Sequence, residues 1–583
     1  MLHTLTRSLR ENKGPALVTV LLSALEVVFE IVIPLFMSNL IDFGIEGGSM
    51  AAVWKFGAFL LLLAAVQLST GVLAARIAAR ASVGFAANLR EDMYNNVQTF
   101  AFSNIDKFST ASIVTRLTTD TTNVQNAFQM LMRMAIRAPV MLIFSMIVSF
   151  RISRDISMTF LIILPILALA LFFIIRSVFP VFSRVFRTYD ELNNVVQENV
   201  RGIRVVKSFN QERHEIGKFG AISARIYKDF SKGERLITLN APLMQFCIYT
   251  CMIVISWLGA KAIIASGNDP ALGLTTGNLT ALITYTMQIL SSLMMLSMVF
   301  AMLTISLSSA RRIAEVLEER SDIPQPEQPV MTVRDGAVDF DHVSFVYASK
   351  ADKKVLDDID LHIRSGETVG VIGGTGASKS SLVQLIPRLY DVTGGKLTLG
   401  GVDVRDYDLD TLRGAVAMVL QKNELFSGTI AENLRWGNEN ATDEQLRHAC
   451  KLACADEFIS AMPDGYDTHI EQGGTNVSGG QKQRLCIARA LLKKPKVLIL
   501  DDSTSAVDTR TDAQIQQALS TYIPDTTKII IAQRISSVQN ADRIVVLDDG
   551  HIDAVGCHDE LLRTCEIYRE VYESQQKGGE DDA

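Results

Sequence analysis

The chain has 583 residues, of which 48% are hydrophobic and 20% are charged, and its formal net charge is −7. Its mean hydropathy of +0.22 is too high for an ordinary soluble protein of this length. The seven cysteines are sparse and follow no extracellular spacing, which excludes a disulfide scaffold, and the slight acidity gives no reason to expect a nucleic-acid partner. Because apolar residues concentrate in the first half, we expect a membrane domain fused to a soluble α/β domain.

Six apolar stretches are each long enough to cross a lipid bilayer. The loops at 44–53 and 266–277 contain no Lys or Arg, whereas the segment at 181–238 is rich in both. By the positive-inside rule, the long loops are therefore cytoplasmic. The six expected spans are residues 16–42, 55–79, 129–150, 157–180, 240–265 and 277–306.

Two cytoplasmic segments are far longer than ordinary connections between membrane spans. Residues 81–128 and 181–239 contain few Pro or Gly, and a structureless loop of that size is uncommon. We therefore expect the membrane helices to extend into the cytoplasm and to turn back near residues 108–114 and 209–219. Such tips could contact the soluble domain.

The sequence changes character after the last apolar stretch. Residues 321–335 carry three prolines and are typical of a linker. Alternating strand and helix patterns follow, beginning with a strand at 367–372 and a helix at 379–389. The expected organisation is a six-helix membrane domain at 1–320, a linker at 321–335, an α/β domain at 336–573 and an acidic tail at 574–583.

A glycine-rich segment, GGTGASKSS, connects that strand to that helix. The backbone amides of such a turn wrap phosphates at a helix N-terminus, while Lys379 neutralises the terminal phosphates and Ser380 binds Mg²⁺. The segment is thus a candidate phosphate-binding loop made of Gly373, Gly374, Thr375, Gly376, Ala377, Ser378, Lys379, Ser380 and Ser381.

Two further features bear on this loop. Ser378 replaces the glycine that usually precedes the lysine, and if that position needs a positive φ, serine costs on the order of 1 kcal/mol. We expect this change to weaken or reshape nucleotide binding without abolishing it.

Farther along, residues 497–501 read VLILD, an apolar strand that ends in a carboxylate. Asp501 can hold Mg²⁺ through water beside the phosphate loop.

The segment VSGGQKQR at 477–484 lies between these two motifs. A phosphate loop, this signature and the acidic strand, in that order, resemble an ATP-binding-cassette (ABC) ATPase. With six spans in front, residues 1–573 resemble a half-transporter of the ABC exporter family. The resemblance implies ATP and Mg²⁺ as cofactors and a second half-transporter as partner. Two cassettes would close head to tail, so that each ATP lies between one phosphate loop and the other signature.

The resemblance also assigns roles to single residues. Tyr347 stands where an aromatic ring stacks on adenine, and Gln421 occupies the loop that senses Mg²⁺ and contacts the membrane domain. Mg²⁺ would be held by Ser380, Gln421 and Asp501. The signature residues that complete the partner's ATP site would be Ser478, Gly479, Gly480 and Gln481.

Two positions depart from the family pattern beside the same nucleotide as Ser378. The residue after the Mg²⁺ carboxylate is usually a glutamate base, but here it is Asp502, one methylene shorter. A general base needs hydrogen-bond reach of about 3 Å, so this carboxylate is expected to be misplaced. The histidine that contacts the γ-phosphate is replaced by Gln533, whose amide is neutral. Since the signature is intact, the pattern predicts a heterodimeric exporter with one degenerate site; the alternative is a homodimer whose two sites both turn over slowly.

Side chains within the spans are candidates for binding a substrate. Glu26 and Glu30 lie one helical turn apart in the first span, and a carboxylate at membrane depth is costly. They either line a translocation cavity and attract cations, or form structural hydrogen bonds to neighbouring helices. Met295 belongs to a stripe of methionines on the sixth span, which suits either an adaptable binding surface or packing.

The sequence therefore predicts a subunit of an ATP-driven exporter of small amphipathic or drug-like compounds, embedded in a bacterial plasma membrane with its ATPase domain in the cytoplasm. Lipids or peptides are the rival substrates. A regulatory ATP-binding subunit and a siderophore importer are the alternative functions, because the direction of transport rests on analogy alone.

Overall fold

The computed structural model describes residues 1–269, 273–347, 354–503 and 505–580. The chain forms two compact units, which we call the membrane unit and the α/β unit. The membrane unit comprises Met1–Gln98 and Thr110–Glu319, and the α/β unit comprises Thr99–Ser109 and Arg320–Ala583. The short segment Thr99–Ser109, which the sequence places in the membrane domain, thus groups with the α/β unit.

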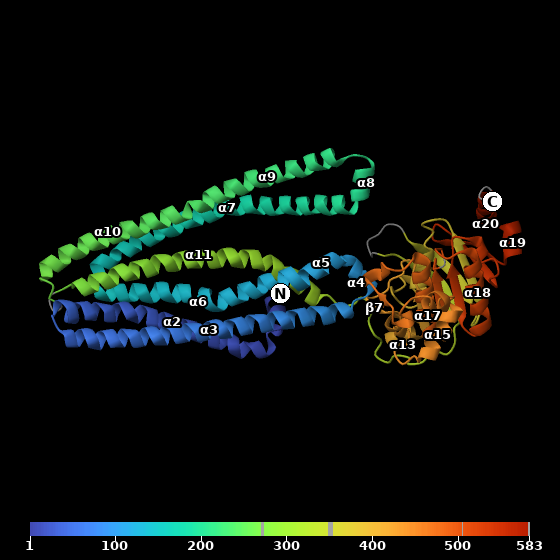
Figure 1. Ribbon diagram of the computed structural model, residues 1–583, viewed down its shortest axis with the longest axis horizontal. Helices are drawn as coiled ribbons and strands as arrows, with labels where there is room; N and C mark the ends of the chain where they lie inside the picture. The colour runs from blue at the N-terminus through green and yellow to red at the C-terminus, as the bar shows by residue number, and fades with distance from the viewer. Residues whose placement is uncertain (270–272, 348–353, 504, 581–583) are drawn as a thin grey trace. The chain divides into compact units, whose positions relative to one another are not determined.

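The membrane unit consists of helices joined by turns and short loops, with no strand in the part of the chain that the structure describes (Figure 1). Six of its helical stretches are long and apolar enough to cross a membrane, as expected. The helices are α1 Leu2–Arg7, α2 Lys13–Asn39, α3 Met50–Gln98, α5 Thr110–Thr115, α6 Thr121–Ile152, α7 Arg154–Arg201, α8 Ile203–Ser208, α9 Glu212–Thr238, α10 Asn240–Ser266 and α11 Thr276–Glu318, with a 3₁₀ turn at Arg10–Asn12 and π-helical turns at Leu40–Glu46 and Arg116–Asp120.

The long helices extend well beyond a bilayer. The α3 helix has 49 residues, and at a rise of 1.5 Å per residue it is about 70 Å long, more than twice the thickness of the hydrocarbon core. Figure 1 shows that α9 and α10 run back along α7, with α8 at the turn. The membrane unit therefore consists of transmembrane helices continuous with long extensions.

The turns at the ends of these extensions lie earlier in the chain than the sequence suggests. The first occupies Thr99–Ser109, where α4 (Phe102–Lys107) is enclosed by stacked Phe100 and Phe108 rings 5.9 Å apart. These aromatic residues resemble a continuing helix in the sequence. The second spans residues 202–211, because α7 ends at Gly202 and Asn210 adopts a positive φ of 53°, a conformation that asparagine tolerates.

The α/β unit contains three sheets, which lie beside short helices (Figure 1). A six-stranded sheet has the order β12-β11-β3-β10-β9-β6, and a four-stranded sheet has the order β2-β1-β4-β5. The β7 and β8 strands, which are far apart in the chain, form a small antiparallel pair. The strands are β1 Val338–Phe345, β2 Leu356–Ile363, β3 Thr368–Gly373, β4 Gly394–Leu399, β5 Val402–Asp403, β6 Val416–Val419, β7 Gly428–Thr429, β8 His469–Ile470, β9 Val497–Asp501, β10 Thr527–Ile531, β11 Arg543–Asp548 and β12 His551–Gly556.

The centre of the six-stranded sheet is buried on both faces. Every residue of β9 and β10 is buried, which explains why β9 reads as an apolar run without alternation. One apolar cluster packs against each face of this sheet. The surrounding helices are α12 Lys379–Gln384, α13 Leu409–Ala415, α14 Ile430–Arg435, α15 Asp443–Leu452, α16 Asp456–Ser460, α17 Gly479–Leu492, α18 Thr509–Tyr522, α19 His558–Thr564 and α20 Glu566–Glu580, with 3₁₀ turns at Gly465–Asp467, Gln472–Gly474 and Ile535–Ser537.

The C-terminal segment is helical rather than extended. The α20 helix continues through residues 574–580, where the sequence predicts an acidic tail. Tyr568 on this helix is completely buried and its hydroxyl lies 2.7 Å from Nδ1 of His558. The helix is thus packed onto the α/β unit.

Candidate functional site

Five strands of the six-stranded sheet run parallel, and four of them, β3, β10, β9 and β6, lead into the candidate residues at one edge. Along this edge they follow the order β3, β10, β9, β6, and Ile531 of β10 pairs with Val371 of β3 and with Asp501 of β9. The carboxyl ends of parallel strands commonly form ligand sites in such sheets. The segments that follow these ends carry the phosphate loop, Gln533, the Asp501–Asp502 pair and Gln421.

The backbone of the phosphate loop is tightly constrained. A Cβ atom on Gly373 would lie 2.2 Å from the carbonyl oxygen of Leu547, so only glycine fits where β3 passes β11. Ser378 precedes α12 with φ 66° and ψ 22°. Position 378 is therefore in the left-handed region, where a serine is strained by on the order of 1 kcal/mol.

Lys379 is held above the loop by the loop's own carbonyl groups. Its Nζ donates hydrogen bonds to the oxygen of Gly373 at 2.9 Å and to that of Gly374 at 2.8 Å. Burial lowers the pKa of Lys379, and the nearby carboxylates of Asp501 and Asp502 oppose this shift. A terminal phosphate at this place would meet a desolvated cation, which strengthens their attraction.

The residues predicted to hold Mg²⁺ offer suitable ligands. Asp501 is 3% exposed, and burial raises the pKa of its carboxyl group while a hydrogen bond with Ser380 lowers it. Gln421 uses its Nε2 toward Asp502, which leaves its amide oxygen as the acceptor. A serine hydroxyl, a carboxylate and an amide oxygen are the hard oxygen ligands that Mg²⁺ prefers.

Asp502 links the two glutamines of the site. Its Oδ2 accepts hydrogen bonds from Nε2 of Gln533 at 2.8 Å and from Nε2 of Gln421 at 3.4 Å. Its backbone has a positive φ of 47°, and its amide donates to the oxygen of Ile531 at 2.9 Å. Burial raises the pKa of this carboxyl group, and the two amides oppose the shift. The structure therefore joins the two positions that depart from the family pattern.

Tyr347 is positioned by Ser381 of the phosphate loop and by Tyr390, which the sequence did not single out. Its hydroxyl shares a hydrogen bond of 2.8 Å with Ser381. Its ring meets Tyr390 edge-on, with the centroids 5.1 Å apart. Because 45% of Tyr347 is exposed, the ring can still stack on a planar ligand.

Tyr390 also contacts α4, within the α/β unit. Its hydroxyl donates to Oδ2 of Asp106 at 2.8 Å, and its ring stacks on that of Phe102 with a centroid distance of 6.0 Å. Burial and the Asp106 carboxylate raise the pKa of Tyr390. The sequence offered no signal for this pairing, since the partners are 284 positions apart.

The signature forms a helix N-terminus that faces an open hollow. Ser478 and Gln481 cap α17 reciprocally: the amide of Gln481 donates to Oγ of Ser478 at 3.3 Å, and the amide of Ser478 donates to Oε1 of Gln481 at 2.9 Å. A Cβ on Gly480 would lie 2.9 Å from the oxygen of Ala506. Such a terminus attracts anions. The hollow, of about 330 Å³, is lined by Ser478, Gly479, Gly480, Arg484, Ala506, Val507 and Asp508.

The two membrane carboxylates are bridged by an arginine. Arg137 of α6 donates from Nη1 to Oε1 of Glu26 at 2.8 Å and from Nη2 to Oε2 of Glu30 at 2.6 Å. A Cβ on Gly71 of α3 would lie 3.2 Å from Oε1 of Glu26, so α3 closes over this group. Arg137 was not among the residues expected at this place, although a cation inside the apolar stretch 129–150 is a sufficient signal.

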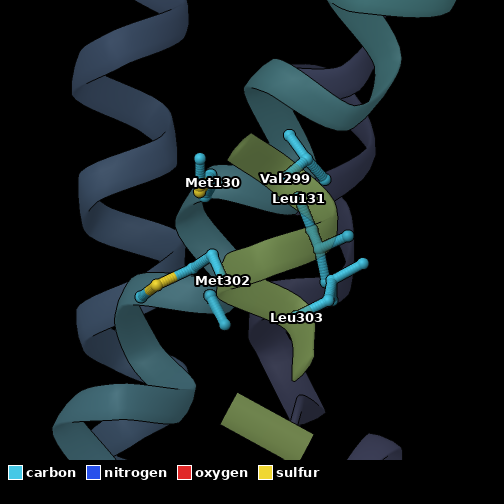
Figure 2. A pocket seen from close by; sticks show the side chains of 6 residues that line it. Met130, Leu131, Val299, Met302 and Leu303 are labelled. Carbon is cyan, nitrogen blue, oxygen red and sulfur yellow. The ribbon is translucent and has the colours of Figure 1, made fainter. Parts of the chain in front are cut away.

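The methionine-rich part of the sixth span is partly used for packing. Figure 2 shows Met302 and Val299 of α11 facing Met130 and Leu131 of α6. The apolar cleft between them has no space for a molecule of the size of water. Met302 therefore packs against α6, while Met295 is partly exposed on the same helix.

Comparisons with known proteins agree with this architecture. The family described as the ABC transporter transmembrane region matches residues 16–294, and the ABC transporter family matches residues 356–505. YfiB, an uncharacterized ABC transporter ATP-binding protein of Bacillus subtilis, is 35% identical over 558 residues, which cover 96% of each chain. A protein of the same description from Mycobacterium tuberculosis is 32% identical over 580 residues, covering 99% of this chain and 98% of that protein.

A solved structure shows the same fold. The structure of a bacterial Atm1-family ABC exporter with ATP bound superposes with a TM-score of 0.82 at 23% sequence identity, covering 97% of this chain and 99% of that chain. The predicted fold class, a six-span helical domain followed by an α/β phosphate-loop domain, is confirmed.

The strain at position 378 can be tested with two substitutions. Ser378→Gly should leave the thermal unfolding temperature of the full chain at or slightly above the wild-type value, because relief of strain is offset by the greater backbone entropy of glycine. Ser378→Val should lower the stability by roughly 1–2 kcal/mol, because a β-branched residue fits the left-handed region worst. Equal stability of both variants in detergent-solubilised protein would show that position 378 leaves this conformation.

The Arg137 bridge can be tested by removing its charges singly and together. Arg137→Met should destabilise the membrane unit by about 3 kcal/mol, since it leaves two carboxylates without their partner. Combining it with Glu26→Gln and Glu30→Gln should restore most of the loss. Arg151→Met, which changes an exposed residue of the same helix, is the matched control. If the triple variant unfolds at the same temperature as Arg137→Met alone, the bridge is not the cause.

Proposed function

The chain belongs to the ABC transporter family, and on that premise we propose that it is one half of an ATP-driven exporter that pairs with a different half-transporter. Its own phosphate loop binds Mg·ATP and hydrolyses it slowly. Its signature, Ser478 to Gln481, completes the faster site on the partner.

The observation that carries this proposal is the contact between Asp502 and Gln533. A base that polarises water must present a carboxylate oxygen to that water within hydrogen-bond distance. Here Oδ2 of Asp502 already accepts two amide hydrogen bonds, so this oxygen is directed to Gln533 and Gln421. The site retains the groups that hold ATP and lacks a well-placed base.

The two halves of the cassette interface support unequal roles. Three departures, Ser378, Asp502 and Gln533, surround one nucleotide, whereas the signature is regular and forms a capped helix with an open anion-binding end. An intact signature can complete a fast ATP site only if the phosphate loop opposite it lacks these departures. That phosphate loop would belong to a different chain. The partner would supply a glutamate base, a switch histidine and an altered signature.

In the proposed ATPase site, the described residues bind the nucleotide, orient it and exclude water. Lys379 and the loop amides hold the phosphates, Ser380, Asp501 and the oxygen of Gln421 suit Mg²⁺, and Tyr347 stacks on the base. The bound metal would neutralise charge on the phosphates. Closure of the two cassettes would then reach the membrane helices through α4 and the other cytoplasmic turns.

We propose small amphipathic compounds, including cations, as the exported substrates. Two carboxylates share one arginine, so the group has a formal excess of one negative charge if all three are ionised. Glu30 is the more accessible carboxylate, with its side chain 25% exposed against 11% for Glu26. Partly exposed Met295 adds a polarizable apolar surface. The location would be a bacterial plasma membrane, with the cassette in the cytoplasm.

A regulatory ATP-binding subunit is the second candidate. The Arg137 bridge favours it, because the bridge occupies the carboxylates that would otherwise attract a cationic substrate. Transport assays on Glu30→Gln distinguish the two: loss of cation export supports the substrate role, and unchanged export together with slower ATP turnover supports regulation.

Restoring the two departures should raise ATP hydrolysis by the chain alone. The purified chain in proteoliposomes should hydrolyse Mg·ATP slowly, and Asp502→Glu combined with Gln533→His should increase the rate at least about tenfold, because a positioned base contributes 10²–10⁴. Asp553→Glu, a conservative change outside the site, should leave the rate unchanged. Lys379→Ala should abolish ATP binding.

A wild-type chain that hydrolyses ATP as fast as the restored variant, and transports without a partner, would contradict the heterodimer. Failure of Lys379→Ala to reduce ATP binding would contradict the assignment of the phosphate loop itself.

A further inference from the structure

The C-terminal helix α20 reaches the nucleotide edge of the α/β unit. Tyr568 and Tyr572 lie one turn apart on α20 and pack into the apolar cluster on one face of the six-stranded sheet. Gln575 lies one further turn along, in the same i, i+4, i+7 series. Packing of the two tyrosines therefore sets the face of α20 on which Gln575 lies.

Gln575 makes two hydrogen bonds to the backbone that carries Gln533. Its Nε2 donates to the oxygen of Gln533 at 2.8 Å, and its Oε1 accepts from the amide of Ile535 at 3.0 Å. One side-chain amide thus spans both sides of Arg534. Donor and acceptor are used together, which defines the orientation of this short segment more strictly than a single bond could.

The segment around Gln533 lies beyond the last paired residue of β10. Pairing of β10 with its neighbours ends at Ile531, and Ala532 makes the next ladder-like contact, from its amide to the oxygen of Val371 at 3.3 Å. Gln533 follows directly. The bonds from Gln575 therefore act where the strand no longer holds the chain.

The consequence extends to the nucleotide site. The side chain of Gln533 donates to Asp502, so the order of contacts runs from α20 through Gln575 and the backbone of Gln533 to the Asp502 carboxylate. We propose that Gln575 is a positioning residue, which sets the Gln533 amide toward the terminal phosphate of ATP and gives the C-terminal helix control over that site. The proposal rests on the proposed function, in which this edge binds ATP.

This arrangement also defines a point of regulation. Any event that lifts the end of α20 from the domain would release Gln533 without touching the phosphate loop. The affected step would be recognition of the terminal phosphate, so binding of ATP should change more than binding of ADP.

The experiment compares two adjacent glutamines of the same helix in the full chain. Gln575→Ala should weaken binding of Mg·ATP by about fivefold while leaving Mg·ADP binding unchanged. Gln576→Ala is the matched control, because Gln576 bonds Tyr572 on its own helix, and it should leave both affinities unchanged. Gln575→Glu keeps the acceptor for the amide of Ile535 and loses the donor to the oxygen of Gln533. The loss of Mg·ATP affinity should therefore be at least intermediate between wild type and Gln575→Ala.

A double-mutant cycle separates positioning from general stability. In a Gln533→Ala background, Gln575→Ala should have little further effect on ATP affinity, since the side chain that it positions is gone. Thermal unfolding of the same samples reports any loss of folding, and Gln575→Glu serves if the alanine variant does not fold.

Equal ATP affinities for Gln575→Ala and Gln576→Ala, or an undiminished effect of Gln575→Ala in the Gln533→Ala background, would overturn the inference. If Lys379→Ala leaves ATP binding intact, the proposed function of the site fails instead, and the two failures are thereby distinguished.

Discussion

The nucleotide edge depends on the parallel pairing of four buried strands. Because β3, β10, β9 and β6 end together, the phosphate loop, Gln533, the Asp501–Asp502 pair and Gln421 meet although they are far apart in the chain. Removing apolar side chains from water stabilises this pairing. The pairing in turn places the polar residues that follow the strand ends along one edge of the sheet. The strained backbone at Ser378 and Asp502 is held in this setting.

Much of this edge could be predicted from local sequence. A glycine-rich turn before Lys379 and an apolar run ending at Asp501 each signal their structure within a few residues. The links across the site could not be predicted in this way. Tyr390 with Asp106, and Gln575 with Gln533, join residues whose spacing carries no periodic pattern, and only tertiary packing brings them together. The turns near α4 and α8 were predicted too late in the chain. Phe100 and Phe108 look like part of a continuous helix in the sequence, and Gly202 and Asn210 were not recognised as turn residues.

Two carboxylates inside the membrane unit are paired with a group of opposite charge. The cost of burying Glu26 and Glu30 is met by Arg137 on another helix, and further bonds from α11 reach the same stretch of α2: Gln288 donates to the oxygen of Glu30 at 3.2 Å, and Tyr285 to that of Ile31 at 2.6 Å. A site that is structurally satisfied can still carry an excess charge. This is why the group supports both helix packing and the proposed preference for cations.

The central claim is that this chain's own site holds ATP through cycles in which the opposite site turns over. The most direct measurement is the identity of the nucleotide cross-linked to the phosphate loop of this chain, after brief turnover of the assembled transporter purified from its own membrane. The account predicts that this nucleotide is still ATP when the partner site already contains ADP. ADP appearing at both sites at the same rate would contradict it.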